Sequence, residues 1–434
     1  MIANMKVKKL ILATVLLTAA SLYGQVPKDF IKDYKAPDFK LRYLDLALSG
    51  RSAGKESQSV GTTGTTSSMW GRATQGWISN NQKYQGNFRV HSSFFGALKT
   101  DSTFALPRTG FSVTTSGSHR WYKNSALYIG FHENSILSLI SWFNQKDIDI
   151  DRHFLSLNLN PALSLGFGRV EYVSFARQTI DVNRLLERSG RLKNSLDKES
   201  ATILANRLTE LNYKRGYDPR LLRIWQLEQL DSTLSSLDVV TKQDMRYMAA
   251  LSDAFVFANS SQRLSGFRME WGLAQQFTAI LSNSNTDLFS DNYFSGGYVS
   301  LNAYIPSSYA FQHDVGVSVL AGGEYDLETE GEFRMWTNAH YVFGWYPNTR
   351  TSLKSSLAYN VSVRDNGFIS GDSRLALDFN YYISPRTRFN VSGAISSNEN
   401  YIRHNFLNIP SGFLARGQFN SGYLLTLGIT HSIF

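Results

Sequence analysis

The sequence predicts an all-β protein: an antiparallel transmembrane β-barrel of about 14 strands (12–16) with an α-helical insertion. First, roughly a dozen stretches alternate apolar and polar residues over about ten positions each, whereas strands of soluble proteins usually run about 5–6 residues. Second, short turns alternate with longer loops, and third, the N-terminus resembles an export signal. In the stretch 350–364, one parity holds Leu353, Leu357, Tyr359, Val361 and Val363, and the other holds Lys354, Ser356, Asn360 and Arg364. One face of this strand therefore suits lipid and the other suits water.

The N-terminal segment predicts a cleaved signal peptide over residues 1–24. Basic residues between Lys6 and Lys9 precede an apolar run over 10–20, and small and polar residues follow. The alternative is an uncleaved membrane helix, but that would need about 20 apolar residues. We expect the remaining chain, 25–434, to form one outer-membrane barrel domain.

Composition limits the chemistry that the chain can perform. The chain has no cysteine, which excludes disulfides, thiol nucleophiles, thiolate metal sites and a lipid-modified cysteine. The formal net charge is +9, and removal of the three lysines of the signal segment leaves +6. This excess is compatible with acidic headgroups outside or anions inside the barrel, and equally with ordinary surface charge.

The C-terminal half supplies the clearest strands. They are expected at about 264–279, 291–305, 309–323, 332–346, 350–364, 371–383, 388–396 and 419–434. Short turns fall at 305–308, 346–349 and 384–387, and loops rich in Asn, Gly, Ser and Asp fall near 280–291, 324–331, 365–370 and 397–418. Bacterial outer-membrane barrels alternate turns and loops in this way, whereas a soluble β-sandwich has no reason to do so.

The N-terminal half predicts weaker strands and one long loop. Strands are expected near 39–49, 84–99, 109–121, 126–133, 151–160 and 162–176, which gives an even total of about 14. The stretch 50–83 is rich in Gly, Ser and Thr and is expected to be a mobile loop.

Residues 179–258 break the β pattern and predict a helical insertion within the barrel domain. Helix-favouring residues dominate there, and apolar residues recur three and four positions apart, which indicates three or four amphipathic helices. Asp218 before Pro219 and the pair Thr241 and Asp244 are typical of helix starts. Counting strands back from the C-terminus places the insertion on the periplasmic side, and a count wrong by one strand would place it outside.

With these features the chain resembles the porin-like class of bacterial outer-membrane β-barrels, which typically end in an aromatic residue such as Phe434. The terminal pattern departs from that class, because the apolar residues 423–433 lie on the parity opposite to Phe434, which requires a bulge or a slipped last residue. The sequence Gly166-Phe167-Gly168-Arg169-Val170-Glu171 before the insertion resembles uncharacterised barrels of the Bacteroidota. The resemblance implies an outer-membrane location and no particular activity.

Catalytic chemistry is not expected. His313 and Asp314 are adjacent, but neighbours on a strand point to opposite faces and cannot form a dyad. His91, His340 and His431 are isolated, so no metal site is expected. No phosphate- or dinucleotide-binding glycine loop is present, so we expect no cofactor, no nucleic-acid partner and no enzyme activity, with an outer-membrane hydrolase as the least favoured alternative.

The polar strand faces give the main functional hypothesis. Nine charged residues fall on the parity assigned to the lumen, namely Arg89, Lys99, Arg268, Glu270, Arg334, Lys354, Arg374, Asp378 and Arg388. A basic lumen would favour anions, and the competing interpretation is that these charges brace a closed interior by ion pairing. We therefore expect a porin-like channel for small solutes surrounded by outer-membrane lipid. The alternative is a non-conducting barrel whose insertion, 179–258, docks to an envelope protein or to peptidoglycan.

Overall fold

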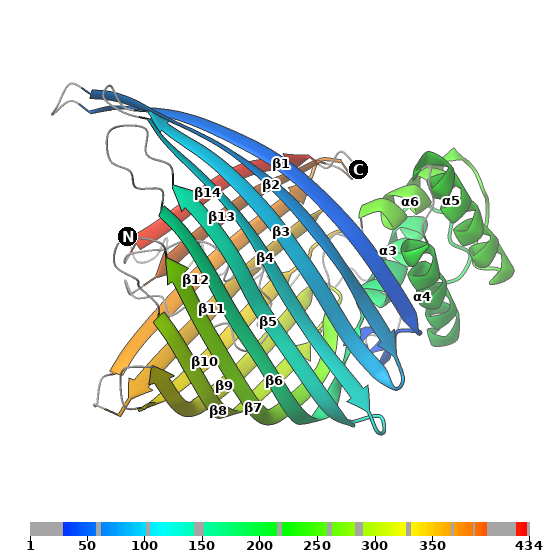
Figure 1. Ribbon diagram of the computed structural model, residues 1–434. Helices are drawn as coiled ribbons and strands as arrows, with labels where there is room; N and C mark the ends of the chain where they lie inside the picture. Colours follow the sequence, from blue (N-terminus) through cyan, green and yellow to red (C-terminus); the bar gives the residue numbers. More distant parts are fainter. Residues whose placement is uncertain are drawn as a thin grey trace, which may run out of the picture.

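Fourteen strands form one antiparallel sheet, in which each strand pairs with its neighbours along the chain in the order β1 to β14. The sheet curls into a barrel, and a group of helices lies at one end (Figure 1). The computed structural model describes residues 29–431 except 58–61, 101–104, 143–151, 215–218, 258–262, 283–289, 327–330, 366–368, 385–386 and 397–421. The predicted fold class is confirmed, while the predicted signal peptide and Phe434 lie outside the described residues.

The strands are long, as the sequence predicts for a membrane barrel. Their bounds are β1 Phe39–Ser57, β2 Thr62–Asn81, β3 Tyr84–Thr100, β4 Ala105–Tyr122, β5 Leu127–Trp142, β6 Arg152–Tyr172, β7 Leu264–Ser282, β8 Ser290–Ile305, β9 Phe311–Asp326, β10 Glu332–Trp345, β11 Thr351–Arg364, β12 Ile369–Tyr382, β13 Thr387–Ser396 and β14 Gly422–His431. Tilted strands of this length can cross the apolar thickness of a bilayer, which needs about 9–11 residues.

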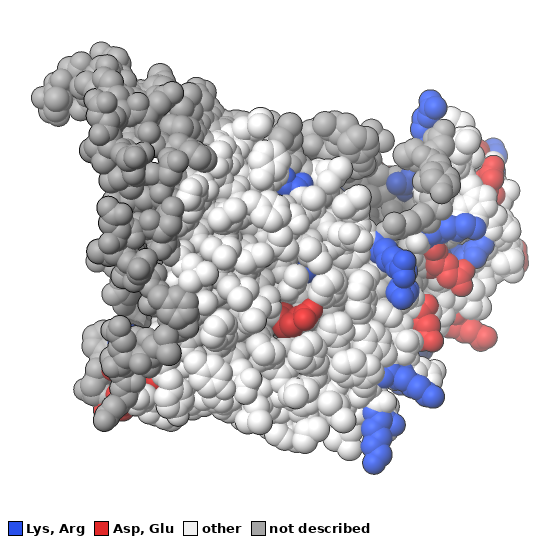
Figure 2. All heavy atoms as spheres, viewed as in Figure 1, with Lys and Arg blue, Asp and Glu red and all other residues white. Residues whose placement is uncertain are grey.

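The two faces of the sheet differ in polarity because side chains alternate along each strand. On β7, Phe267, Trp271 and Leu273 are exposed on the outer face, whereas Glu270 and Ala274 are buried on the inner face. Figure 2 shows the resulting outer wall, which carries few charges, while Lys, Arg, Asp and Glu gather near the helical end. The sheet thus presents a lipid-compatible exterior and a polar interior.

Two sequence predictions in the N-terminal half are wrong. The stretch 50–83 is not a loop, because it contains the end of β1 and the whole of β2, which pair over their full length. The strands expected at 151–160 and 162–176 are a single strand, β6, which runs through Pro161. The ladder between β6 and β7 lacks pairs at 160 and 161, so the missing N–H of the proline breaks no pair with β7.

The insertion leaves the barrel at two glycines with unusual backbone angles. Gly168 on β6 has φ 96° and Gly266 on β7 has φ 119°, values that residues with a Cβ rarely adopt. A Cβ on Gly266 would lie 2.2 Å from the carbonyl oxygen of Arg169. Glycine is therefore required where the paired strands turn out of the sheet into the helices.

The insertion consists of four helices, α3 Ser174–Arg188, α4 Lys198–Tyr213, α5 Pro219–Ser236 and α6 Met245–Phe257, and a short helix α2 Phe30–Asp33 precedes β1. The Asp197 side chain accepts from Ser200 N at the start of α4. Asp244 accepts from Arg246 N and Tyr247 N, each over 3.1 Å, and so is itself the cap of α6, which corrects the expected cap at Thr241. None of the helices in the described ranges is long and apolar enough to cross a membrane.

The helices lie at the end of the barrel that carries the short connections. The turns β2–β3, β4–β5, β8–β9, β10–β11 and β12–β13 all lie at this end, together with the start of β1 and the end of β14. The β6–β7 connection that holds the insertion belongs to the same set (Figure 1). We call this the short-turn mouth of the barrel.

Candidate functional site

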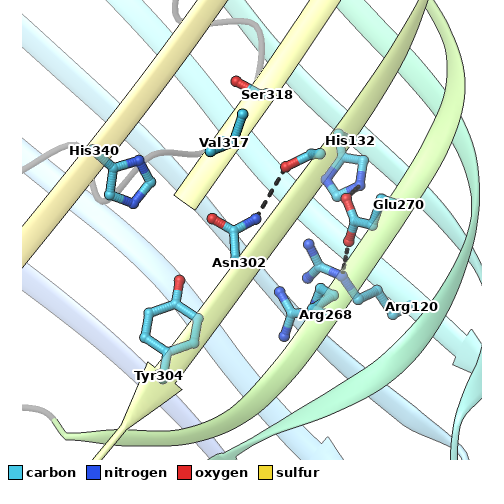
Figure 3. A pocket seen from close by; sticks show the side chains of 10 residues that line it. Arg120, His132, Arg268, Glu270, Asn302, Tyr304, Val317, Ser318 and His340 are labelled. Atoms are coloured by element: carbon cyan, nitrogen blue, oxygen red, sulfur yellow. Dashed lines mark hydrogen bonds and ion pairs between the residues drawn. The ribbon is translucent and has the colours of Figure 1, made fainter. Parts of the chain in front are cut away.

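Inside the barrel, near the short-turn mouth, one buried carboxylate organises the polar face of the sheet. Glu270 on β7 is 4% exposed. Arg120 on β4 donates from Nε to Glu270 Oε1 over 2.6 Å, and the Tyr128 hydroxyl on β5 donates to the same oxygen over 2.8 Å. His132 Nε2, also on β5, lies 3.1 Å from Glu270 Oε2 (Figure 3). We call these four residues the Glu270 cluster.

The Glu270 cluster fixes the shape of the lumen at this level. β5 and β7 are not neighbours in the sheet, because β6 lies between them, so the contacts of Tyr128 and His132 with Glu270 cross the inner face of β6. Removing one partner of a buried ion pair costs about 3–5 kcal/mol, because the other charge is left uncompensated. The cluster therefore holds three strands at a set distance from one another.

A second network links the lumen to the short-turn mouth. The Tyr122 hydroxyl donates to Gln85 Oε1 over 2.9 Å, and Gln85 Nε2 donates to Asn80 Oδ1 over 2.7 Å and to the Val170 carbonyl over 2.9 Å. Arg169 donates from Nη2 to Asn80 Oδ1 over 3.2 Å, and its Cζ lies 4.8 Å from the centroid of the Tyr122 ring. These contacts connect β2, β3, β4 and β6 near the mouth, and the centroid of the Tyr122 ring lies 5.1 Å from that of the Tyr128 ring in the Glu270 cluster.

A cavity of about 40 Å³ lies beside the Glu270 cluster. Its lining comes from six strands, β4, β5 and β7 to β10, so it lies within the lumen. Arg268, Asn302 and Tyr304 line the cavity together with Arg120 and Glu270 (Figure 3). The lining therefore holds two guanidinium groups and only one carboxylate.

The structure places the nine charged residues predicted to line the lumen on the inner parity of their strands. Arg89 is exposed within β3, and its Nε donates to Tyr43 OH over 3.1 Å. Lys99 lies opposite Leu106 in the β3–β4 ladder, and its side chain lies outside the described part of the structure. Arg268 and Glu270 line the cavity described above.

The other five predicted residues lie on β10 to β13, where cross-strand pairs place acids beside bases. Arg334 pairs with Glu324 and lies 3.8 Å from Glu332. Lys354 on β11 lies directly opposite Asp378 on β12. Arg374 lies opposite Ala358 and Ser396, and Arg388 lies opposite Tyr382 and Thr430. Part of the basic excess on the inner face is therefore matched by carboxylates.

Sequence reasoning missed three members of the Glu270 cluster. Arg120, Tyr128 and His132 all lie on the inner parity, and Ser118 pairs with His132 in the β4–β5 ladder. An inward arginine and histidine on consecutive predicted strands are a usable signal. Their common contact with Glu270 could not be predicted from the sequence, because Glu270 follows an insertion of about 90 residues.

The helical insertion packs around its own apolar core. Residues buried in that core come from α3, α4, α5 and α6, for example Leu186, Leu204, Leu230 and Leu251. Phe30, Ile31 and Tyr34 from the segment before β1 are part of the same core, and so are Tyr309 and Ala310 from the β8–β9 turn. The insertion and the short-turn mouth therefore share one hydrophobic core.

A buried polar contact attaches α3 to two turns of the barrel. The Tyr309 hydroxyl in the β8–β9 turn donates to Asp181 Oδ1 on α3. Arg177, also on α3, donates from Nη2 to the Asn348 carbonyl in the β10–β11 turn over 2.9 Å, and its Nε lies 3.8 Å from Asp181 Oδ2. All these side chains of α3 are almost fully buried, which fixes the orientation of the helix on the mouth.

Arg263, just before β7, reinforces this attachment. It donates to the carbonyls of Ser308 and Phe311 over 3.0 and 2.7 Å, and its Nε donates to Gln312 Oε1 over 3.1 Å. Burial lowers the pKa of Arg263 to about 10, so the guanidinium stays charged at neutral pH.

The insertion reaches across the short-turn mouth. At one side, the ring of Phe39 at the start of β1 stacks on Tyr213 of α4 with centroids 4.4 Å apart. At the other side, α3 contacts the turns β8–β9 and β10–β11. In the order β1 to β14 the β8–β9 turn begins seven places from β1, so the insertion contacts widely separated parts of the mouth.

A larger cavity of about 1130 Å³ lies at the short-turn mouth beside the insertion. It is bounded by residues 32–38, by the turns β2–β3 and β4–β5, and by the ends of β6 and β7 that lie at the mouth. Its lining contains six basic residues, Lys32, Lys35, Lys83, Lys123, Arg169 and Lys198, and three acidic residues, Asp33, Asp38 and Glu171. We call this cavity the vestibule, and Arg169 connects it with the polar network of the lumen.

Comparison with known proteins adds little to this picture. No protein-family model and no curated protein sequence matches the chain. Similar solved structures include the translocator domain of the autotransporter NalP from Neisseria meningitidis, at 9% identity and a TM-score of 0.31 over 79% of this chain and 88% of that one. The P. putida toluene transporter TodX is similar at 8% identity and a TM-score of 0.31 over 86% of each chain. The transport unit of the autotransporter AIDA-I from Escherichia coli is similar at 10% identity and a TM-score of 0.26 over 97% of each chain.

Likenesses this distant carry no argument about activity. The assignment of this chain as a membrane-spanning β-barrel rests on its own strand order, on the length of its strands and on the contrast between its outer and inner faces.

Proposed function

We propose that the protein is an outer-membrane porin-like channel for small solutes, with a preference for anions. The observation that supports this most is the polar inner face of the sheet, which continues from the lumen cavity to the open vestibule at the short-turn mouth. A polar interior suits hydrated solutes, as in water-filled porins. The inner face carries Arg89, Arg268, Lys354 and other charged residues.

The preference for anions follows from the vestibule and from the lumen. The vestibule lining has twice as many basic residues as acidic residues. A cleft lined by one sign of charge raises the local concentration of ions of the opposite sign. Ion pairing within the lumen weakens this effect there, so the vestibule is the main source of selectivity.

We place the short-turn mouth, and with it the insertion, in the periplasm. In outer-membrane barrels the short turns face the periplasm and the longer loops face outward. The even number of strands supports this orientation, because it brings both ends of the sheet to the side of the short turns.

A second function, a scaffold that conducts nothing, is favoured by the surface of the insertion. The side chains of Leu221 and Ile224 on α5 are 66% and 55% exposed, and Met245 at the start of α6 is 84% exposed. Exposed apolar residues on a folded helical unit can contact an envelope protein. In that case the Glu270 cluster would serve to close the lumen.

Planar-bilayer recording of the mature protein separates the two functions. We expect steady single-channel openings with a higher permeability for chloride than for potassium. A matched variant in which residues 174–262 are replaced by a short turn should conduct more, because the mouth is uncovered. A folded protein that is silent both with and without the insertion would contradict the channel and support the scaffold.

A further inference from the structure

We infer that the lumen cavity beside the Glu270 cluster binds one small inorganic anion of the size of chloride, with Arg268 as its cationic partner. The first argument is the balance of charge. Arg120 is matched by Glu270 at 2.6 Å. Arg268 has no hydrogen bond or ion pair with another residue in the described part of the chain, and its Nε is buried without a partner.

Arg268 is half-buried and shares the single carboxylate of Glu270 with Arg120, so its desolvation is only partly offset by attraction. Water alone would supply hydrogen-bond acceptors but no negative charge. A cation is excluded from the cavity by the two guanidinium groups in its lining. An anion next to Arg268 restores the balance that the protein itself does not provide.

The neutral groups of the lining suit an anion because they can donate hydrogen bonds. Asn302 Nδ2 donates to Ser300 Oγ over 3.0 Å, which leaves the hydroxyl hydrogen of Ser300 free to point into the cavity. The hydroxyl of Tyr304 is a further donor in the lining. His340 Nδ1 is buried and has no partner within the described residues, so this nitrogen can donate as well if its tautomer carries the proton there.

The size of the cavity limits the anion. A volume of about 40 Å³ admits a few species of the size of water, each of which needs about 10–15 Å³ on this measure. A halide fits this space, and larger anions fit it less well.

The inference deepens the proposed function and rests on it in one respect, since the ion must enter through a lumen that admits small solutes. The two remain separable by experiment. A barrel that conducts but binds no anion at Arg268 refutes the site and leaves the channel. A barrel that binds the anion but never conducts refutes the channel and leaves the site.

Diffraction from crystals of the mature protein grown in sodium bromide tests the site without any mutation. We expect an anomalous peak within hydrogen-bond distance of the Arg268 guanidinium and on the Asn302 side of the cavity. A map in which bromide occupies the protein surface but leaves this cavity without a peak would overturn the proposal.

Thermal unfolding gives the matched test in solution. Because a ligand that binds only the folded state raises its stability, the unfolding midpoint should be higher in sodium chloride than in sodium gluconate at equal ionic strength. The Arg268→Gln variant should lose this difference, and Arg89→Gln, which changes an exposed lumen arginine outside the cavity, should keep it. Equal midpoints of the natural protein in the two salts, or a chloride effect that persists in Arg268→Gln, would refute the site.

Discussion

Replacing Glu270 by glutamine would remove the one negative charge in the Glu270 cluster while keeping the size of the side chain. Arg120 Nε lies 2.6 Å from Glu270 Oε1, and both side chains are buried. Two unit charges about 4 Å apart attract by about 4 kcal/mol at an effective dielectric constant of about 20. Breaking a buried ion pair by removing one partner costs about 3–5 kcal/mol. We therefore expect Glu270→Gln to lower the free energy of unfolding by about 3–5 kcal/mol.

The assay is urea unfolding of the barrel in lipid vesicles, followed by tryptophan fluorescence and by mobility on unheated gels. The control is Arg89→Gln, whose side chain is exposed in the lumen and should change stability by less than about 1 kcal/mol. The double variant Arg120→Met with Glu270→Met should recover much of the loss, because neither charge is then left unpaired. A Glu270→Gln protein within about 1 kcal/mol of the natural one would refute the view that this cluster holds the strands together.

Three further predictions concern the wall, the β6–β7 exit and the insertion. Glu133 lies on the outer parity of β5, which is otherwise mostly apolar, so Glu133→Leu should stabilise the barrel in bilayers by about 1–2 kcal/mol, and a loss of stability would show that the carboxylate has a role in the membrane. Gly266→Ala should lower the yield of folded barrel, because its φ of 119° and the Arg169 carbonyl 2.2 Å from the added Cβ leave no room; a normal yield on unheated gels would contradict this. Hydrogen bonds from Arg191 hold the pKa of Asp244 well below its ordinary value of 3.8, so its contribution to stability is complete above about pH 4 and is lost as the pH falls through the lower folded pKa. Hydrogen exchange in α6 should thus speed up between about pH 4 and pH 2 relative to the rest of the insertion, and this difference should be absent in Asp244→Asn.

The sequence predicted the C-terminal strands well because their faces are chemically distinct. Between 290 and 396, the expected strands differ from β8 to β13 by at most three residues at either end. Each of these strands places apolar residues on one parity and polar residues on the other, which is the alternation that a lipid-facing wall imposes.

The N-terminal half was harder to predict for two physical reasons. β2 is rich in Gly, Ser and Thr, and because clusters of these residues are typical of loops it looked like a loop, yet its backbone pairs with both β1 and β3. Pro161 looked like a strand end, although β6 continues through it because the neighbouring ladder has no pair at that position. The two errors cancelled, so the predicted total of about 14 strands agrees with the structure.

The candidate site was predictable only in part. Parity alone put Arg268 and Glu270 on the inner face, since alternation needs no knowledge of the fold. The contacts between Glu270, Arg120 and His132 depend on the twist of the sheet and on an insertion that separates their strands in the sequence. The contact of α3 with Tyr309 could not be predicted from a hydrophobic pattern either, because it joins segments 128 residues apart.

The most direct test of the channel uses the absence of cysteine from the chain. A single cysteine in place of Arg89 should lie in the lumen, and one in place of Val90 should face lipid. We predict that a membrane-impermeant, negatively charged methanethiosulfonate reagent reduces the single-channel current of Arg89→Cys and leaves that of Val90→Cys unchanged. A current that the reagent does not alter in Arg89→Cys, or no current from either folded protein, would contradict the account.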